Sequence, residues 1–115
     1  MHLKNFSLIV RDGRVTMAPA YDLLNTTLVL MNAVEESALS LRGKKRKLTR
    51  DDWIDYFCIG RLGLAVRLVD ELLETLTLAI PVWRRLIPCS KLSPGRQAAY
   101  LSLVEERAER LLAGL

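Results

Sequence analysis

The fold at the N-terminal end is decided by one stretch, Phe6-Ser7-Leu8-Ile9-Val10-Arg11-Asp12-Gly13-Arg14-Val15-Thr16-Met17. Its two ends, residues 6–10 and 15–17, are rich in the β-branched and aromatic residues that favour strands. Asp12-Gly13 between them is a strong hairpin signal, because glycine accepts the positive φ that a tight turn requires. Pro19 ends the second strand, since proline cannot donate a hydrogen bond to a strand ladder. The sequence therefore predicts a small N-terminal β-hairpin.

The chain from residue 49 onward has the pattern of helices. Thr49 followed by Asp51 and Asp52 indicates a helix start, with a threonine N-cap and acidic residues in the first turn. Ser93-Pro94 indicates a second start, with proline at the first helical position. The apolar stripe of the first helix is Trp53, Ile54, Phe57 and Cys58.

Two longer helices complete this predicted bundle. One begins after Gly63 and runs to about Ile80, and Arg67 on its polar face precedes Asp70 and Glu71 by three and four residues, the spacing of helical ion pairs. A short segment containing Trp83 then lies between Pro81 and Pro88, and the last helix follows it. The predicted inward positions are Ala65, Leu68, Val69, Leu72, Leu73 and Leu76, then Tyr100, Leu103, Val104, Ala108, Leu111 and Leu112.

Between the hairpin and the helices the pattern is weaker. Residues 23–36 fit either a loop or a short helix, and residues 38–41 fit one more short strand. The predicted fold class is mainly α with a small N-terminal β-hairpin. We expect one domain over residues 1–115, in which residues 1–48 hold the hairpin and a loop and residues 49–115 form a helical bundle.

Composition narrows the class of protein. The chain has 115 residues, of which half are hydrophobic and 26% are charged, and this composition excludes a disordered tail. Cys58 and Cys89 are too few for a disulfide framework, and with a single histidine a structural zinc site would need several carboxylates, so we set zinc aside. The chain shows neither an apolar stretch long enough to span a membrane nor a signal peptide. We therefore expect a cytoplasmic domain with no membrane partner.

The net charge of +4 is uneven along the chain. Residues 1–50 carry a charge of +5 and residues 51–115 carry −1, mostly because of a basic run, Lys44-Lys45-Arg46-Lys47 with Arg42 and Arg50. Such a run is typical of a phosphate-facing patch for nucleic acid. The pattern favours a solvated loop instead, because Gly43 opens the run, no aromatic residue is interleaved and no helix carries it.

The candidate chemistry lies on either side of the hairpin, at Asn5 and Asp22. A hairpin brings two residues 17 apart in sequence to the same end of a ribbon. Phosphoryl-transfer enzymes of the protein-kinase type hold magnesium with an Asn and an Asp, whose oxygens are hard ligands. The alternative is structural: Asn5 ends a turn and Asp22 makes a local backbone hydrogen bond.

These residues carry a resemblance to a known family. His2-Leu3-Lys4-Asn5-Phe6, the hairpin and then Pro19-Ala20-Tyr21-Asp22 resemble the C-terminal region of HipA-like serine/threonine kinases, the toxins of bacterial toxin–antitoxin modules. The stretch Ala38-Leu39-Ser40-Leu41-Arg42-Gly43-Lys44 is similar to the strand and Gly-Lys turn that follow in this family. The resemblance implies the helical C-lobe of a protein-kinase-like fold, with ATP and magnesium as cofactors of the full-length kinase.

Carried over residue by residue, the resemblance implies that Asn5 and Asp22 are the magnesium ligands. It also implies that His2, Lys4 and Tyr21 line the phosphate side of the nucleotide. Lys4 is alternatively a solvated strand-end lysine, Tyr21 a core ring with its hydroxyl at the rim, and His2 a frayed terminal residue.

The family pattern also has parts that these 115 residues do not contain. The catalytic base, an Asp two residues before the His, would fall immediately ahead of Met1, and the N-lobe with its phosphate-binding loop and lysine would precede it. Phosphoryl transfer depends on positioning and electrostatics supplied by both lobes. We therefore expect a C-terminal fragment that has no catalytic residue of its own, binds ATP weakly or not at all, and is inactive alone.

The resemblance implies three partners: the missing kinase N-lobe, a DNA-binding antitoxin and, as protein substrate of the full kinase, an aminoacyl-tRNA synthetase. We also expect apolar surface around Leu3, Phe6, Leu8 and Val10, through which the chain could self-associate. Two other functions remain open. One is a non-catalytic module that pairs with a separate N-lobe or antitoxin, and the other is a small basic nucleic-acid-binding helical domain.

Overall fold

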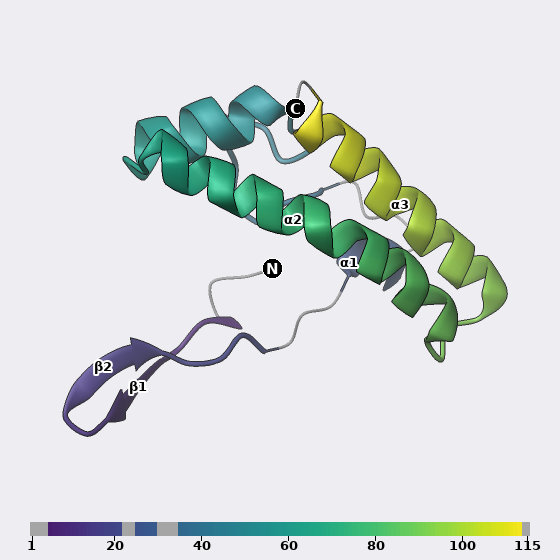
Figure 1. Ribbon diagram of the computed structural model, residues 1–115, viewed down its shortest axis with the longest axis horizontal. Helices are drawn as coiled ribbons and strands as arrows, with labels where there is room; N and C mark the ends of the chain where they lie inside the picture. Colours follow the sequence, from purple (N-terminus) through teal and green to yellow (C-terminus); the bar gives the residue numbers. More distant parts are fainter. Residues whose placement is uncertain (1–4, 22–24, 30–34, 114–115) are drawn as a thin grey trace.

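The computed structural model describes residues 5–21, 25–29 and 35–113. Its fold is mainly helical with a small two-stranded hairpin at the N-terminal end, as the sequence predicts (Figure 1). The hairpin projects from the helices, and α2 and α3 lie against each other. In chain order the elements are β1 (Leu8–Arg11), β2 (Arg14–Met17), the short helix α1 (Thr26–Val29), the π-helix η2 (Asp52–Arg61), α2 (Val66–Leu86), the 3-10 turn η3 (Ile87–Cys89) and α3 (Pro94–Leu112).

The hairpin is closed by the two residues that the sequence singles out. Asp12 and Gly13 both have positive φ, 50° and 73°, as a type I′ turn requires. This turn matches the right-handed twist of the strands, which explains why it connects them directly. The antiparallel register pairs Leu8 with Met17, and the N–H of Ala18 donates to the carbonyl of Ser7 at 2.8 Å. The ladder therefore extends one pair beyond the strands.

One face of this hairpin is apolar and uncovered. The register places Leu8, Val10, Val15 and Met17 on that face, and these four residues are 61–70% exposed. Phe6 is exposed as well, whereas Leu3 lies outside the described residues. The radius of gyration is 16.1 Å, against about 13 Å for a compact domain of this length. The difference reflects a ribbon that leaves the helical part.

The first helix begins as predicted, at a threonine cap. The N–H of Asp52 donates to Thr49 Oγ1 at 3.4 Å, and the N–H of Thr49 donates to the Asp52 carboxylate at 3.0 Å. This reciprocal pair is a capping box with aspartate in the place of glutamate. The helix continues as η2, in which the rings of Trp53 and Phe57 meet edge to face at 6.2 Å. It ends at Arg61, and Gly63 just beyond it, with a φ of 65°, allows the chain to leave the helix.

The prediction that Pro81 ends the second helix is wrong. Helix α2 runs through Pro81 to Leu86, so the segment around Trp83 belongs to the same helix. A proline inside a helix costs one backbone hydrogen bond. Here the side chains of Ile80 and Ile87, on either side of it, are both buried, and their packing holds the helix together across the proline. Among the described residues, no helix has the length and apolarity needed to cross a membrane.

The core is small and is centred on α2. Val69 and Leu73 are buried as predicted, but Ala65, Leu68 and Leu72 are exposed, so that part of the prediction is wrong. The sequence predicts more inward-facing residues than α2 buries, because only a narrow strip of this helix contacts its neighbours. The predicted inward residues of α3 are half-buried. The buried apolar side chains of the described residues are Leu41, Leu48, Val69, Leu73, Ile80 and Ile87.

The predicted strand at residues 38–41 is also wrong. Only Leu41 pairs, through two 2.8 Å backbone hydrogen bonds with Lys44. Arg42 and Gly43 between them both have positive φ, which makes a tight turn with no strand on either side. The ambiguous region before it holds the short helix α1 within its described part.

Candidate functional site

The candidate site lies at the open end of the hairpin, opposite the Asp12-Gly13 turn. The ladder closes with the Ser7–Ala18 pair, so Asn5 stands two residues before it and Tyr21 three residues after it. Both residues therefore leave the ribbon at the same end. The sequence predicts that Asn5 and Asp22 meet at this end, but Asp22 lies outside the described residues, so that pairing stays a prediction.

The described residues contain part of the predicted site. Asn5 is buried, with 7% of its surface exposed, whereas Tyr21 is 44% exposed. His2, Lys4 and Asp22 lie outside the described residues. Their predicted roles as phosphate-side residues and, for Asp22, as magnesium ligand stay predictions.

The chemistry of the donors suits magnesium. The Asn5 side chain offers a neutral carbonyl oxygen, and Asp22, the residue after Tyr21, offers a carboxylate in the sequence. Hard oxygen ligands of this kind, completed by water and phosphate oxygens, are the usual environment of Mg²⁺. In the described part of the chain, no three His, Cys, Asp or Glu side chains gather to hold a metal ion.

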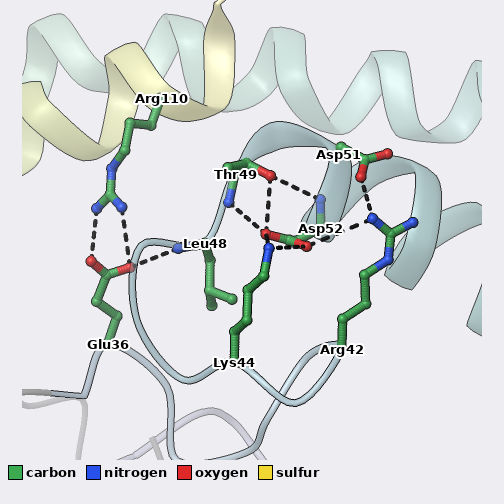
Figure 2. A network of polar contacts seen from close by, with 8 residues as sticks. All are labelled: Glu36, Arg42, Lys44, Leu48, Thr49, Asp51, Asp52 and Arg110. Carbon is green, nitrogen blue, oxygen red and sulfur yellow. Dashed lines mark hydrogen bonds and ion pairs between the residues drawn. The ribbon is translucent and has the colours of Figure 1, made fainter.

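A second polar cluster fixes the basic loop to the helices (Figure 2). Its centre is Asp52, which is fully buried and accepts hydrogen bonds from the N–H and Oγ1 of Thr49, both at 3.0 Å. Lys44 Nζ lies 3.4 Å from each carboxylate oxygen of Asp52. The backbone hydrogen bond from Thr49 lowers the pKa of Asp52 from its ordinary value, and this effect outweighs the burial that raises it. Asp52 is therefore held as a buried anion.

Arg42 adds a second cation to the same cluster. Its guanidinium pairs with Asp51 and lies 3.8 Å from Asp52. The guanidinium also lies 4.9 Å from the centre of the Tyr56 ring, within cation–π range. The turn at Arg42 and Gly43 is thereby tied to η2 through two aspartates and one aromatic ring.

Glu36 forms the other half of the network in Figure 2, between the loop and α3. Its carboxylate accepts a hydrogen bond from Arg110 at 3.0 Å and one from the N–H of Leu48 at 3.4 Å. Burial raises the pKa of Glu36, but the hydrogen bonds from Arg110 and from the backbone of Lys47 and Leu48 outweigh it, so the net pKa is lowered. Arg110 also pairs with Glu106 at 3.5 Å.

Most of the basic side chains of this run are engaged in such ion pairs and hydrogen bonds. Lys45 pairs with Glu35 at 3.2 Å, and Arg50 donates to the carbonyl of Leu111 at 2.9 Å. Within the described residues, only Arg46 and Lys47 of the run form no side-chain ion pair or hydrogen bond. The run serves mainly to attach the loop to the protein.

The sequence reasoning missed Glu36 and the central role of Asp52. For Asp52 the signal was present, because Thr49 and Asp52 have the spacing of a capping box. For Glu36 no local signal existed, since its partner Arg110 lies 74 residues away.

The described fold and candidate site define a class of protein. It is a helical domain preceded by a β-hairpin, with Asn5 and Tyr21 at the open end of the hairpin. A scan against protein-family models gives the family: residues 1–83 match the HipA-like C-terminal domain. Because the match covers well over half of the chain, this protein belongs to the family of HipA-like C-terminal domains. Kinases of this family use ATP and magnesium.

The match reaches further than the motif-level resemblance of residues 1–44. It includes the hairpin, the basic loop, η2 and most of α2, whereas α3 lies outside it. No curated protein matches the chain.

Proposed function

We propose that this chain supplies the magnesium- and ATP-binding half of the C-terminal lobe of a HipA-like serine/threonine kinase, the toxin of a bacterial toxin–antitoxin module. Membership of the HipA-like C-terminal family supports the proposal. The observation that carries it is the hairpin register, which brings Asn5 and Tyr21, the residue before Asp22 in the sequence, to the same end of the ribbon.

Each site residue has a distinct part in this proposal. Asn5 offers a carbonyl oxygen and Asp22 a carboxylate, so that one neutral and one charged oxygen face the cation. His2, Lys4 and Tyr21 line the phosphate side, where a cation or a hydrogen-bond donor stabilises phosphate oxygens. Bound magnesium would neutralise the phosphate charge that develops during transfer.

The polypeptide of these 115 residues is proposed to be inactive on its own. It contains neither a glycine-rich phosphate-binding loop nor the Asp that the family pattern places two residues before its His. Catalysis of phosphoryl transfer consists almost entirely of positioning and electrostatic stabilisation, to which both lobes contribute. The C-terminal half can hold a metal but cannot orient ATP against a hydroxyl.

We propose three partners by analogy with kinases of this family. An N-lobe would supply the missing phosphate loop and lysine, a DNA-binding antitoxin would hold the kinase, and an aminoacyl-tRNA synthetase would be the phosphorylated substrate. The exposed hairpin face of Leu8, Val10, Val15 and Met17 is the surface through which we propose contact with an N-lobe or with a second copy.

Calorimetric titration with Mg·ATP tests this function. We expect the 115-residue polypeptide to bind Mg·ATP no more tightly than about 1 mM, because only half of the nucleotide contacts exist, which leaves about 4 kcal/mol of binding free energy. Asp22→Asn is expected to weaken even that binding. Micromolar affinity, or phosphate transfer from ATP by the polypeptide alone, would contradict the proposed need for a second lobe.

A nucleic-acid-binding function rests on the basic run and is disfavoured by its ion pairs. Arg42, Lys44 and Lys45 each face a carboxylate, so few cations are free to displace counterions from a duplex. We expect no shift of a generic 30-base-pair DNA in a gel at 150 mM salt. A salt-dependent shift that Arg46→Gln with Lys47→Gln abolishes, and that Arg96→Gln on α3 leaves intact, would restore this function.

A further inference from the structure

A cavity of about 240 Å³ lies between α2 and α3, away from the hairpin. Its walls are mostly apolar: Leu76, Ile80 and Trp83 come from α2, and Leu103, Val104 and Leu111 from α3. Asn25, next to α1, lies at its edge. Cavities of about 150 Å³ hold benzene, and drug-sized ligands occupy about 300 Å³ or more, so this volume suits about ten non-hydrogen atoms.

One charged group stands in this apolar wall. Arg107 lines the cavity, and its Nη2 donates to Thr27 Oγ1 at 3.0 Å. Its Nε is shielded from solvent and has no hydrogen-bond partner. Among the described residues, no carboxylate forms an ion pair with Arg107.

Arg110, one turn further along α3, also has an Nε without a hydrogen-bond partner, but its guanidinium has the carboxylate partners that Arg107 lacks. Arg110 pairs with Glu36 and Glu106, whereas the nearby Glu105 pairs with Arg84. Glu105 and Glu106 of this helix are thus directed to other arginines, and Glu109 forms no ion pair with Arg107. The Arg107 guanidinium therefore has a neutral hydroxyl as its partner in an otherwise apolar wall, and it can still bind an anion.

We propose that the α2–α3 cavity binds a small carboxylate with an apolar tail. The carboxylate accepts hydrogen bonds from the Arg107 guanidinium, whose fork geometry matches two carboxylate oxygens. The tail lies among the aliphatic side chains and against the Trp83 ring. The whole α3 wall, Arg107 included, falls outside residues 1–83, so this site is distinct from the family motif at the hairpin.

Octanoate, with ten non-hydrogen atoms, is the probe, and the fluorescence of Trp83 is the signal. The experiment uses the full chain with Trp53→Phe, so that Trp83 is the single tryptophan. We expect a saturable change in Trp83 emission with octanoate, and at least about tenfold weaker binding of 1-octanol, which has the tail without the charge.

Two variants assign the charge contact. Arg107→Met keeps an apolar stem and is expected to weaken octanoate binding at least about tenfold while leaving 1-octanol binding unchanged. Arg96→Met, on the exposed side of α3, is expected to change neither affinity. Should Arg107→Met not fold, as judged by circular dichroism, Arg107→Lys replaces it and is expected to bind octanoate less tightly than wild type, because lysine lacks the fork.

Three results would overturn the proposal. They are the absence of saturable binding below the micelle concentration of octanoate, equal affinity for octanoate and 1-octanol, and an octanoate affinity that does not respond to the charge or shape of residue 107. A Trp83 signal that changes with protein concentration in the absence of ligand would show a second copy in the cavity, which also overturns it. None of these readouts involves magnesium or ATP, so the experiment tests this cavity independently of the proposed kinase function.

Discussion

Replacing Asp52 by alanine is expected to lower the free energy of unfolding by about 2–3 kcal/mol, because hydrogen bonds to a buried charge are lost together. The carboxylate accepts the N–H and Oγ1 of Thr49 and faces Lys44 and Arg42. Its removal leaves the N–H of Thr49 and the ammonium of Lys44 without their acceptor, whereas Arg42 keeps Asp51 as its partner. Because the buried core is small, this loss is a large fraction of a typical stability of about 5–15 kcal/mol.

Urea unfolding followed by circular dichroism measures this effect. Asp55→Asn is the matched control, since Asp55 lies on the same helix but is exposed, and we expect it to stay within about 0.5 kcal/mol of wild type. Asp52→Asn keeps the shape of the side chain and loses only its charge, so its effect should lie between the two. An Asp52→Ala variant as stable as Asp55→Asn would show that the network in Figure 2 does not hold the loop.

The same carboxylate predicts acid sensitivity. The pKa of Asp52 is lowered from its ordinary value of 3.8, and that of Glu36 from 4.5. Below these values the unfolded chain binds more protons than the native protein, so stability is fully present above about pH 5 and is lost as pH falls through the native pKa values. Asp52→Ala should lose less stability than wild type between pH 5 and pH 2. An identical decline in both proteins would contradict the lowered pKa of Asp52.

Features set by neighbouring residues were predictable from the sequence. The hairpin follows from Asp12-Gly13 between two β-rich runs, because the turn chemistry acts over four residues. The helix starts at Thr49 and Ser93-Pro94 follow for the same reason, since caps act within one turn. The common end for Asn5 and Tyr21 is a consequence of the hairpin register.

Features set by distant packing were not predictable. Helix α2 passes through Pro81 because the side chains of Ile80 and Ile87 are buried by other parts of the fold, which no local rule contains. The Glu36–Arg110 pair and the Arg107 cavity join residues more than 70 positions apart. For the candidate site, the family pattern named Asn5 and Asp22 as ligands, whereas spacing alone left a structural alternative open.

The second large effect is expected at the metal. We predict that Asp22→Asn abolishes cation binding at the open end of the hairpin, because it removes the charged member of the ligand pair. Asp12→Asn is the matched control: it makes the same change at the opposite end of the ribbon, about 16 Å away at about 3.3 Å per strand residue, in a turn that accepts asparagine.

Paramagnetic Mn²⁺ in place of Mg²⁺ tests the central claim most directly, since it takes the same oxygen ligands and broadens nearby amide resonances even when it binds weakly. In wild type and Asp12→Asn, the Asn5 and Tyr21 amides should broaden strongly and that of Gly13 little. In Asp22→Asn the Asn5 and Tyr21 resonances should stay sharp. Equal broadening of these two amides in wild type and Asp22→Asn, or broadening centred on Gly13, would contradict a magnesium site at the open end of the hairpin.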